Sequence, residues 1–256
     1  MRVTSVQLEI KDQEKEKTLE YVLKILSQIP TSDLILLPEL WPCGYLSFDR
    51  YRDESEPIDG PTVKALKRKA IELESHIFMG SIVEKDRHNL FNTTLLLNPQ
   101  GQIIARYRKI HLFGYQSQES EILSRGEDLV VVDTPWGIAG ISTCYDLRFP
   151  ELYRRMVDQG AQFFLVAAAW PYPRLEAWIL LNRVRALENV AYLFSCNCGG
   201  LNRGRQYVGH SMFIDPWGTI IAGGGDGECI VSAEVDVGSV DSVRNDFRVL
   251  DDRVLD

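Results

Sequence analysis

The chain has 256 residues, of which 45% are hydrophobic and 25% charged, and its formal net charge is -8. A nucleic-acid partner is disfavoured, because an acidic surface repels phosphate backbones and no Lys/Arg-rich block opposes this locally. The longest apolar stretch, 163–170, is too short to cross a bilayer, and the first residues lack the apolar core of a signal peptide. We therefore expect a cytoplasmic protein that binds neither nucleic acid nor membranes.

Strand-like and helix-like patterns alternate along nearly the whole chain. A strand over 3–10 is followed by a helix over 14–29, whose apolar residues recur at helical spacing, and by a buried strand within 33–40. A helix over 61–76 begins with a proline. The remaining predicted elements are strands at 77–85, 90–98 and 102–113, strand-like sequence at 129–144, a helix at 150–159, a strand at 161–170, a helix at 173–190, and strands at 191–200, 212–222 and 230–237.

Several of these strands are apolar on both faces, which is typical of sheets that are covered on both sides. No low-complexity linker divides the sequence and no repeat is evident. The pattern predicts an α/β fold with residues 1–256 as a single domain. The segment 242–256 has little periodicity, and we expect it to form a C-terminal tail that wraps a neighbour or frays.

One cysteine stands out among five. In a cytoplasmic chain of this size the cysteines are expected to be free thiols. Cys144 ends an apolar, Gly-rich strand just before a helix that begins near Pro150. The partial positive charge of a helix start favours a thiolate, and the Tyr145 N–H could face an oxyanion. The alternative is a buried cysteine that packs as a small hydrophobic residue.

A nucleophilic cysteine needs a proton acceptor, and the sequence offers two kinds. His111, two residues after Lys109, leaves a Cys/His peptidase open. Glu39 follows a buried aliphatic run, where a carboxylate is costly unless it is paired or takes part in chemistry. Lys109 lies among aromatic and aliphatic residues. The alternative for Lys109 is an edge-strand lysine that discourages aggregation. The alternative for Glu39 is an ion pair or a helix cap.

Three sequence blocks together resemble a known family. "LLPEL" with the following "GY" (36–45), "YRKIHLFG" (107–114) and "STCYDLRFPELYR" (142–154) are similar to the signature blocks of the nitrilase, or carbon–nitrogen hydrolase, superfamily. Further matches at 90–113, 183–197 and 209–222 follow in order over almost the whole chain. The resemblance implies a four-layer α-β-β-α sandwich of two mixed β-sheets between helical layers.

The resemblance also implies roles for individual residues. Glu39 matches the general base, Lys109 the catalytic lysine and Cys144 the nucleophile of a thioester mechanism, with the oxyanion held by Lys109 and the Tyr145 N–H. A second glutamate is expected between the lysine and cysteine blocks, where Glu119 matches best and Glu121 is the alternative. We expect no cofactor and no metal ion, because the "CNC" at 196–198 lacks a second pair of ligands at zinc spacing.

Within the superfamily, "CYDLRFPELYR" and "DPWG" are most similar to ω-amidases, which hydrolyse the terminal amide of short α-keto acid amides such as α-ketoglutaramate. A small pocket for such an anion would be lined by Tyr45, Phe113 and Trp170, with Arg148 or Arg174 for its carboxylate. Arg148 could instead pair with Asp146 or Glu151. The sequence also leaves open an N-carbamoyl amidase, a true nitrilase and a non-catalytic binding protein. Family members commonly assemble, so 150–160 and 242–256 are candidate contacts of a homodimer or higher homo-oligomer.

Overall fold

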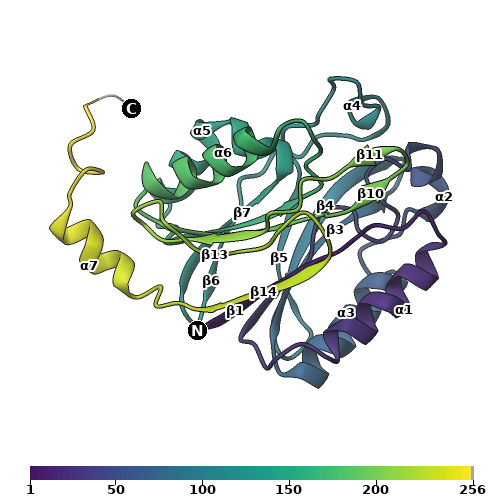
Figure 1. The fold of residues 1–256 in the computed structure, drawn as a ribbon, viewed down its shortest axis with the longest axis horizontal. Coiled ribbons are helices and arrows are strands. Elements are labelled where there is room, and N and C mark those ends of the chain that lie inside the picture. Colours follow the sequence, from purple (N-terminus) through teal and green to yellow (C-terminus); the bar gives the residue numbers. More distant parts are fainter. Residues whose placement is uncertain (255–256) are drawn as a thin grey trace.

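In the computed structural model, which describes residues 1–254, two six-stranded sheets lie face to face between helices (Figure 1). The first sheet has the order β14 (Cys229–Glu234), β1 (Arg2–Gln7), β2 (Leu34–Leu36), β3 (His76–Asp86), β4 (Asn89–Leu97), β5 (Ile103–Arg108). The second has the order β13 (Ile220–Gly223), β12 (Met212–Ile214), β9 (Tyr192–Asn197), β8 (Phe163–Ala168), β7 (Gly137–Thr143), β6 (Val131–Thr134).

Both sheets are mixed in the same way. In the first, β1, β2 and β3 run parallel while β14, β4 and β5 pair antiparallel with their neighbours. In the second, β7, β8 and β9 run parallel while β6, β12 and β13 pair antiparallel. Parallel strands need crossover connections, which explains why helices cover the outer faces.

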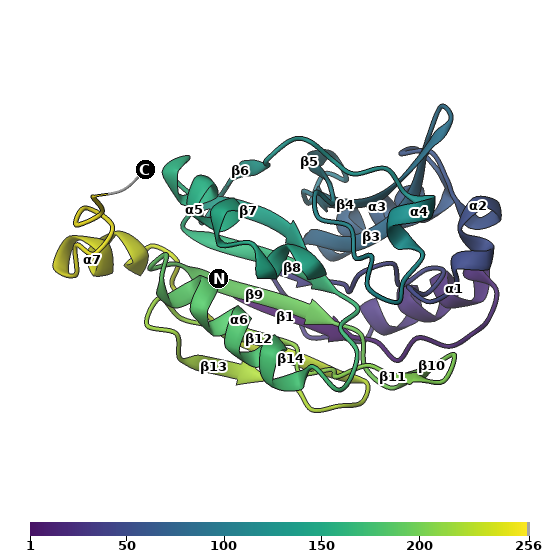
Figure 2. The same ribbon diagram turned by 90° about the horizontal axis from the view of Figure 1, so that it is seen from above.

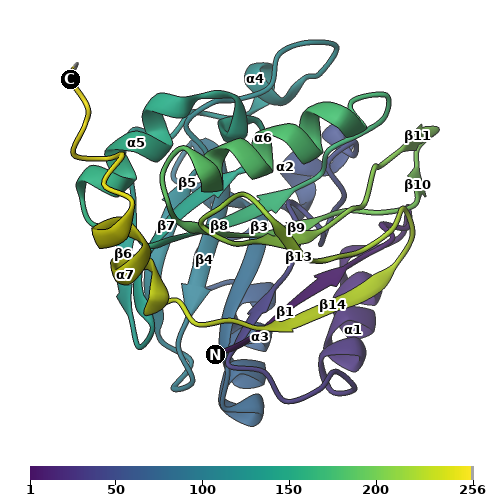
Figure 3. The ribbon, with the colours of Figure 1, turned by 60° about the vertical axis from the view of Figure 1, so that its left-hand side comes forward.

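The helices form the two outer layers (Figures 2 and 3). Helices α1 (Lys15–Leu26) and α3 (Pro61–Leu73) bury one apolar stripe each against the first sheet. Helices α5 (Pro150–Asp158) and α6 (Leu175–Leu187) cover the second sheet. A separate apolar cluster that includes Phe78, Phe163 and Phe194 fills the space between the sheets. The predicted α-β-β-α sandwich is therefore confirmed.

The main elements follow the sequence prediction, with differences at their ends. The predicted strand 102–113 ends at Arg108, and the strand-like sequences 129–144 and 212–222 are the hairpins β6–β7 and β12–β13. Several short elements were not predicted: η1 (Phe48–Arg50), α2 (Tyr51–Glu54), α4 (Glu119–Ile122), η2 (Cys144–Arg148), β10 (Leu201–Asn202), β11 (Arg205–Gln206) and α7 (Ser239–Asp246).

The predicted tail begins inside a helix, because α7 extends to Asp246 and projects at one end of the molecule (Figures 1 and 2). The Arg244 guanidinium anchors this helix by donating to the backbone oxygens of Ala161, Asn189 and Val190. Residues 255 and 256 of the predicted tail lie outside the described residues. None of the helices within residues 1–254 has the length and apolar character required to span a membrane.

Candidate active site

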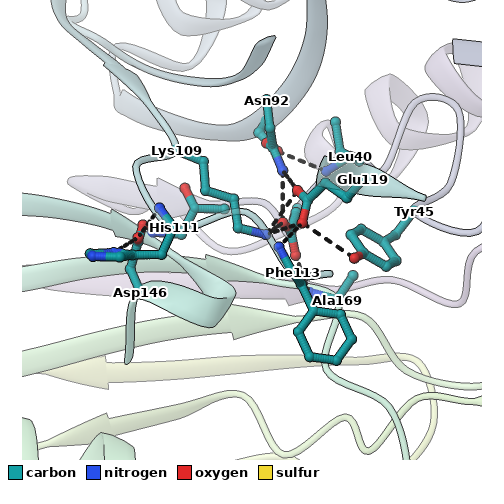
Figure 4. A network of polar contacts seen from close by, with 12 residues as sticks. Leu40, Tyr45, Asn92, Lys109, His111, Phe113, Glu119, Asp146 and Ala169 are labelled. Atoms are coloured by element: carbon teal, nitrogen blue, oxygen red, sulfur yellow. Dashed lines mark hydrogen bonds and ion pairs between the residues drawn. The ribbon is translucent and has the colours of Figure 1, made fainter. Parts of the chain in front are cut away.

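The candidate residues come together where strands of both sheets end. Glu39 lies three residues after β2, Lys109 directly after β5, and Cys144 directly after β7. Ala169 follows β8 at the same edge. The carboxyl ends of parallel strands are the usual place for a site in open α/β sheets. Glu39 and Lys109 thus come from the first sheet and Cys144 from the second. Figure 4 shows the network of polar contacts in which Lys109, Asn92 and Glu119 take part.

Lys109 is the centre of this network. Its Nζ donates to Glu39 Oε1 at 2.8 Å and to Glu119 Oε1 and Oε2 at 2.9 and 3.0 Å, and all three side chains are buried. Burial alone would lower the pKa of Lys109, but the carboxylates of Glu119 and Glu39 outweigh it and raise that pKa well above its usual value. The lysine therefore stays an ammonium, and with both glutamates ionised the cluster carries one net negative charge.

Glu39 is held at both carboxylate oxygens. Oε1 accepts from Lys109 and also from Asn92 Nδ2 at 2.8 Å, while Oε2 accepts the Ala169 N–H at 2.9 Å. Complete burial raises the pKa of Glu39, and the Lys109 ammonium acts in the opposite direction. A carboxyl with a raised pKa that is fixed in orientation can accept and return a proton near neutral pH.

Cys144 is 8% exposed and begins η2 with a left-handed backbone, φ 49°. Its thiol interacts with the Glu39 carboxyl and the Ala169 N–H. Burial raises the pKa of the Cys144 thiol well above its usual value, and the Glu39 charge adds to the effect. The expectation that the helix start stabilises a thiolate is therefore wrong for the resting site. The raised pKa favours the protonated thiol in the resting site.

The turn that carries Cys144 is anchored by Asp146. This buried carboxylate accepts the Thr143 N–H at 2.9 Å, the Tyr107 hydroxyl at 2.6 Å, and the backbone N–H of His111 at 3.1 Å. The His111 Nδ1 lies 2.7 Å from the same carboxylate, and its ring stacks on Phe149. His111 is therefore engaged with Asp146, and the carboxyl beside the thiol is that of Glu39. This arrangement does not support the Cys/His peptidase.

The second glutamate of the network is Glu119. It is completely buried in α4, and its Oε2 accepts the Phe113 N–H at 2.8 Å and the Tyr45 hydroxyl at 3.3 Å. Glu121 is exposed. The geometry thus separates the two candidates that the sequence left open: only Glu119 contacts Lys109.

A small, narrow pocket opens beside Cys144. Arg148 lies over the Trp170 ring at 5.0 Å, and Arg174 lies over the Phe113 ring at 5.4 Å. Neither arginine forms an ion pair with any residue of 1–254, so the alternative pairing of Arg148 with Asp146 or Glu151 is not formed. The pocket is lined by Tyr45, Phe113, Cys144, Tyr145, Arg148, Ala169, Trp170, Pro171 and Arg174.

The pocket therefore brings together all five side chains predicted for substrate binding. Sequence reasoning missed Asn92, the Ala169 N–H and the anchoring role of Asp146. The sequence gives no distinct signal for Asn92, because the strand sequence "LFNTTLLL" places two more polar residues, Thr93 and Thr94, directly after it. Across residues 1–254, no group of three or more His, Cys, Asp or Glu side chains is placed to hold a metal ion.

Comparison with known proteins gives a consistent result. A family model described as carbon-nitrogen hydrolase matches residues 2–245. A 2-oxoglutaramate amidase of Bacillus subtilis is 38% identical over 228 residues, covering 86% of this chain and 85% of the relative. Another, of Paenarthrobacter nicotinovorans, is 32% identical over 249 residues, covering 94% and 85%.

Among solved structures, a branch 10 member of the nitrilase superfamily from Saccharomyces cerevisiae superposes with a TM-score of 0.89. The two are 31% identical, and the match covers 100% of this chain and 97% of that one. The sequence blocks, the sandwich and these matches lead to one conclusion: the chain belongs to the carbon–nitrogen hydrolase family.

Proposed function

We propose that the protein is an amidase that hydrolyses the terminal amide of a short α-keto acid amide, such as α-ketoglutaramate, to the acid and ammonia. The observation that carries this proposal is a small pocket lined by the buried Cys144 and by two arginines that form no ion pair within residues 1–254. The similarity to two 2-oxoglutaramate amidases supports the same substrate class.

In the first half of the reaction, Glu39 takes the Cys144 proton as the sulfur attacks the amide carbon. The resulting oxyanion is stabilised by the Lys109 ammonium and by the Tyr145 N–H, which lies in the first turn of η2, where N–H groups lack intrahelical acceptors. Glu39 then gives its proton to the amide nitrogen, the C–N bond breaks, and ammonia leaves. The product is a thioester on Cys144.

In the second half, Glu39 removes a proton from water as the water oxygen attacks the thioester carbon. The C–S bond breaks, the acid leaves, and the proton returns to the Cys144 sulfur. Glu119 positions Lys109 through two hydrogen bonds. No metal ion or cofactor enters these steps as we propose them.

The substrate carboxylate is assigned to Arg148 or Arg174, both of which can bind it by charge-assisted hydrogen bonds. Tyr45, Phe113 and Trp170 would enclose the short carbon chain. The two assignments differ in kinetics. Replacing the arginine that binds the carboxylate with methionine should raise KM for the keto acid amide while leaving KM for a short neutral amide nearly unchanged.

The substrate class is tested by ammonia release from α-ketoglutaramate, glutamine, an N-carbamoyl amino acid and a nitrile. We expect the keto acid amide to have the highest kcat/KM. Turnover of the nitrile alone, or of the carbamoyl compound alone, would overturn the assignment. The Cys144→Ala variant should retain the native circular dichroism spectrum but lose turnover, and full activity in this variant would refute the site.

We also propose a cytoplasmic homodimer or higher homo-oligomer. The cytoplasmic location is supported by five free cysteines, because reducing compartments keep thiols unpaired. The proposed contacts run through 150–160 and 242–254. The second is supported by exposed apolar side chains, because Trp217 and Phe247 lie with their ring centroids 5.5 Å apart. Sedimentation of wild type and of Phe247→Glu tests this proposal, and a monomeric wild type would contradict it.

A further inference from the structure

Among residues 1–254, Asn92 is the one neutral side chain that bonds to both glutamates of the site. It lies on β4 with 1% exposure, and its Nδ2 donates to Glu39 Oε1 at 2.8 Å and to Glu119 Oε1 at 3.0 Å (Figure 4). Its Oδ1 has no hydrogen-bond partner among the described residues. Both amide hydrogens are therefore committed to carboxylates. The opposite orientation would point Oδ1 at two carboxylate oxygens, which repel it.

These contacts make the two oxygens of Glu39 unequal. A carboxylate oxygen accepts about two hydrogen bonds in its plane. Oε1 receives two, from Lys109 and Asn92, and is saturated. Oε2 receives only the Ala169 N–H and keeps one free position. A proton taken from the thiol can therefore be accommodated on Oε2 but not on Oε1 without breaking a hydrogen bond.

We propose that Asn92 is a positioning residue that saturates Oε1 of Glu39 and thereby confines proton transfer to Oε2. This inference rests on the proposed function, because it assigns the acid–base atom of that reaction. Lys109 alone would leave a free position on Oε1, whereas Oε2 accepts the same Ala169 N–H that acts on the Cys144 thiol. The Asn92 amide also holds Glu39 and Glu119 on either side of Lys109. One ammonium can therefore form hydrogen bonds with both carboxylates.

Asn92 also affects the charge state of Glu39. The charged or titratable groups around this carboxyl are Lys109, Glu119 and Cys144, with the Cys198 thiol and the Tyr45, Tyr51 and Tyr207 hydroxyls nearby. Lys109 is the only cation among them. The Asn92 N–H donates to the carboxylate oxygen that Lys109 also contacts, and a hydrogen bond to the ionised form favours that form. Its loss should raise the pKa of Glu39 further.

The test compares Asn92→Ala with Asn182→Ala. Asn182 is also fully buried, donates its Nδ2 to a backbone oxygen in α6, and has an Oδ1 without a partner, but it does not contact the site. Both variants thus lose a buried amide of the same kind. Asn92→Ser is the second variant, because its hydroxyl is too short to reach both glutamates and it tests the same loss if the alanine variant does not fold.

Three measurements are made on each folded variant: kcat and KM for the keto acid amide, the pH profile of kcat/KM, and the rate of Cys144 alkylation by iodoacetamide against pH. For Asn92→Ala or Asn92→Ser we expect kcat to fall about 10- to 100-fold with KM nearly unchanged. The acid limb of both pH profiles should move up by about one unit. Asn182→Ala should keep the wild-type profiles.

Unchanged profiles in both Asn92 variants, or a loss of kcat with no shift of the acid limb, would overturn the proposal. The alkylation profile does not depend on the substrate. If wild type fails to hydrolyse the keto acid amide, the proposed function fails, while the shift in alkylation still decides the role of Asn92.

Discussion

Two acid–base clusters, one on strands β3 to β5 and one beyond the ends of β2 and β5, differ in how their charges balance. In the first, Glu84 accepts from Arg106, Arg108 and the Thr93 hydroxyl, and Arg108 also pairs with Asp86 at 2.5 Å. Two carboxylates thus meet two guanidinium groups at the half-exposed outer side of β5.

In the second cluster, two carboxylates share the single ammonium of Lys109, the residue after Arg108. The cluster is completely buried, and neutral donors from Asn92, Ala169 and Phe113 replace the missing cation. The difference shows how the same residue types serve two purposes. Full neutralisation holds a sheet edge together, whereas a deficit of positive charge leaves one carboxylate oxygen able to take a proton.

The comparison is tested most strongly by the same substitution in both clusters. Glu39→Gln removes the proposed base, so we expect kcat/KM to fall by about 10³- to 10⁴-fold with the fold retained. Glu84→Gln should leave kcat/KM within about 3-fold and lower the free energy of unfolding by about 1.5–3 kcal/mol, because it weakens charge-assisted hydrogen bonds. Ammonia release and urea denaturation measure the two quantities. Equal losses of activity in the two variants would remove the distinction.

Lys109 and Arg108, which are adjacent cations in the sequence, provide the next test of this comparison. Lys109→Met leaves Glu39 and Glu119 buried without a cation, which should lower the free energy of unfolding by about 3–5 kcal/mol and abolish turnover. Arg108→Met leaves Glu84 with Arg106 and should cost about 1 kcal/mol, because this pair is partly exposed. Denaturation midpoints of both variants are compared by circular dichroism. A Lys109→Met protein as stable as wild type would show that the glutamates do not need the lysine.

The pH dependence of activity is the third test. Because burial raises the pKa of Glu39, the base is ionised only above the usual glutamate range, and kcat/KM should fall as pH decreases through that raised value. The contribution of Glu39 to protein stability changes with pH in the opposite direction to activity. The folded state holds this proton more tightly than the unfolded chain, so the contribution of Glu39 to the free energy of unfolding decreases as pH rises through the same interval. Rates that stay constant down to about pH 4, the ordinary range of glutamate, would contradict the raised pKa.

Selective alkylation is the smallest expected effect. Iodoacetamide should label Cys144 first, because Glu39 deprotonates it. Burial raises the pKa of Cys43 to about 12 and raises those of Cys229 and Cys144 as well, but of these three thiols only Cys144 has the Glu39 carboxylate beside it. In Glu39→Gln, the preference for Cys144 over Cys229 should shrink. Mass spectrometry that finds Cys43 or Cys229 labelled first in wild type would contradict activation of Cys144.

Much of the fold could be predicted, because long elements carry a periodic signal. The helix over Pro61–Leu73 and the strands that precede Glu39 and Cys144 follow directly from apolar spacing. Helix α7 could not be predicted in this way. It is held by Arg244 bonds to backbone oxygens 54 to 83 residues away, a contact that leaves no local pattern.

The site was predictable only in part. The resemblance gave Glu39, Lys109 and Cys144, and the buried charge of Glu39 pointed to the same residue independently. The state of the thiol was predicted wrongly, because the effect of the helix start was considered without the cost of burial. The sequence analysis missed Asn92 because no rule of residue spacing identifies a single functional amide within a strand. Its role becomes visible only once both glutamates are placed in space.

The pairing of strand β1 in the first sheet affects how the chain is synthesised. This strand pairs on one side with β2 and on the other with β14, whose last residue is Glu234. On the ribosome, β1 therefore waits for its outer neighbour while all the residues between Gln7 and Cys229 are translated. An unpaired strand edge can join the same edge of another nascent chain. Polysomes that carry this message would bring many such edges together, so chaperone protection should matter most just before Cys229 is added.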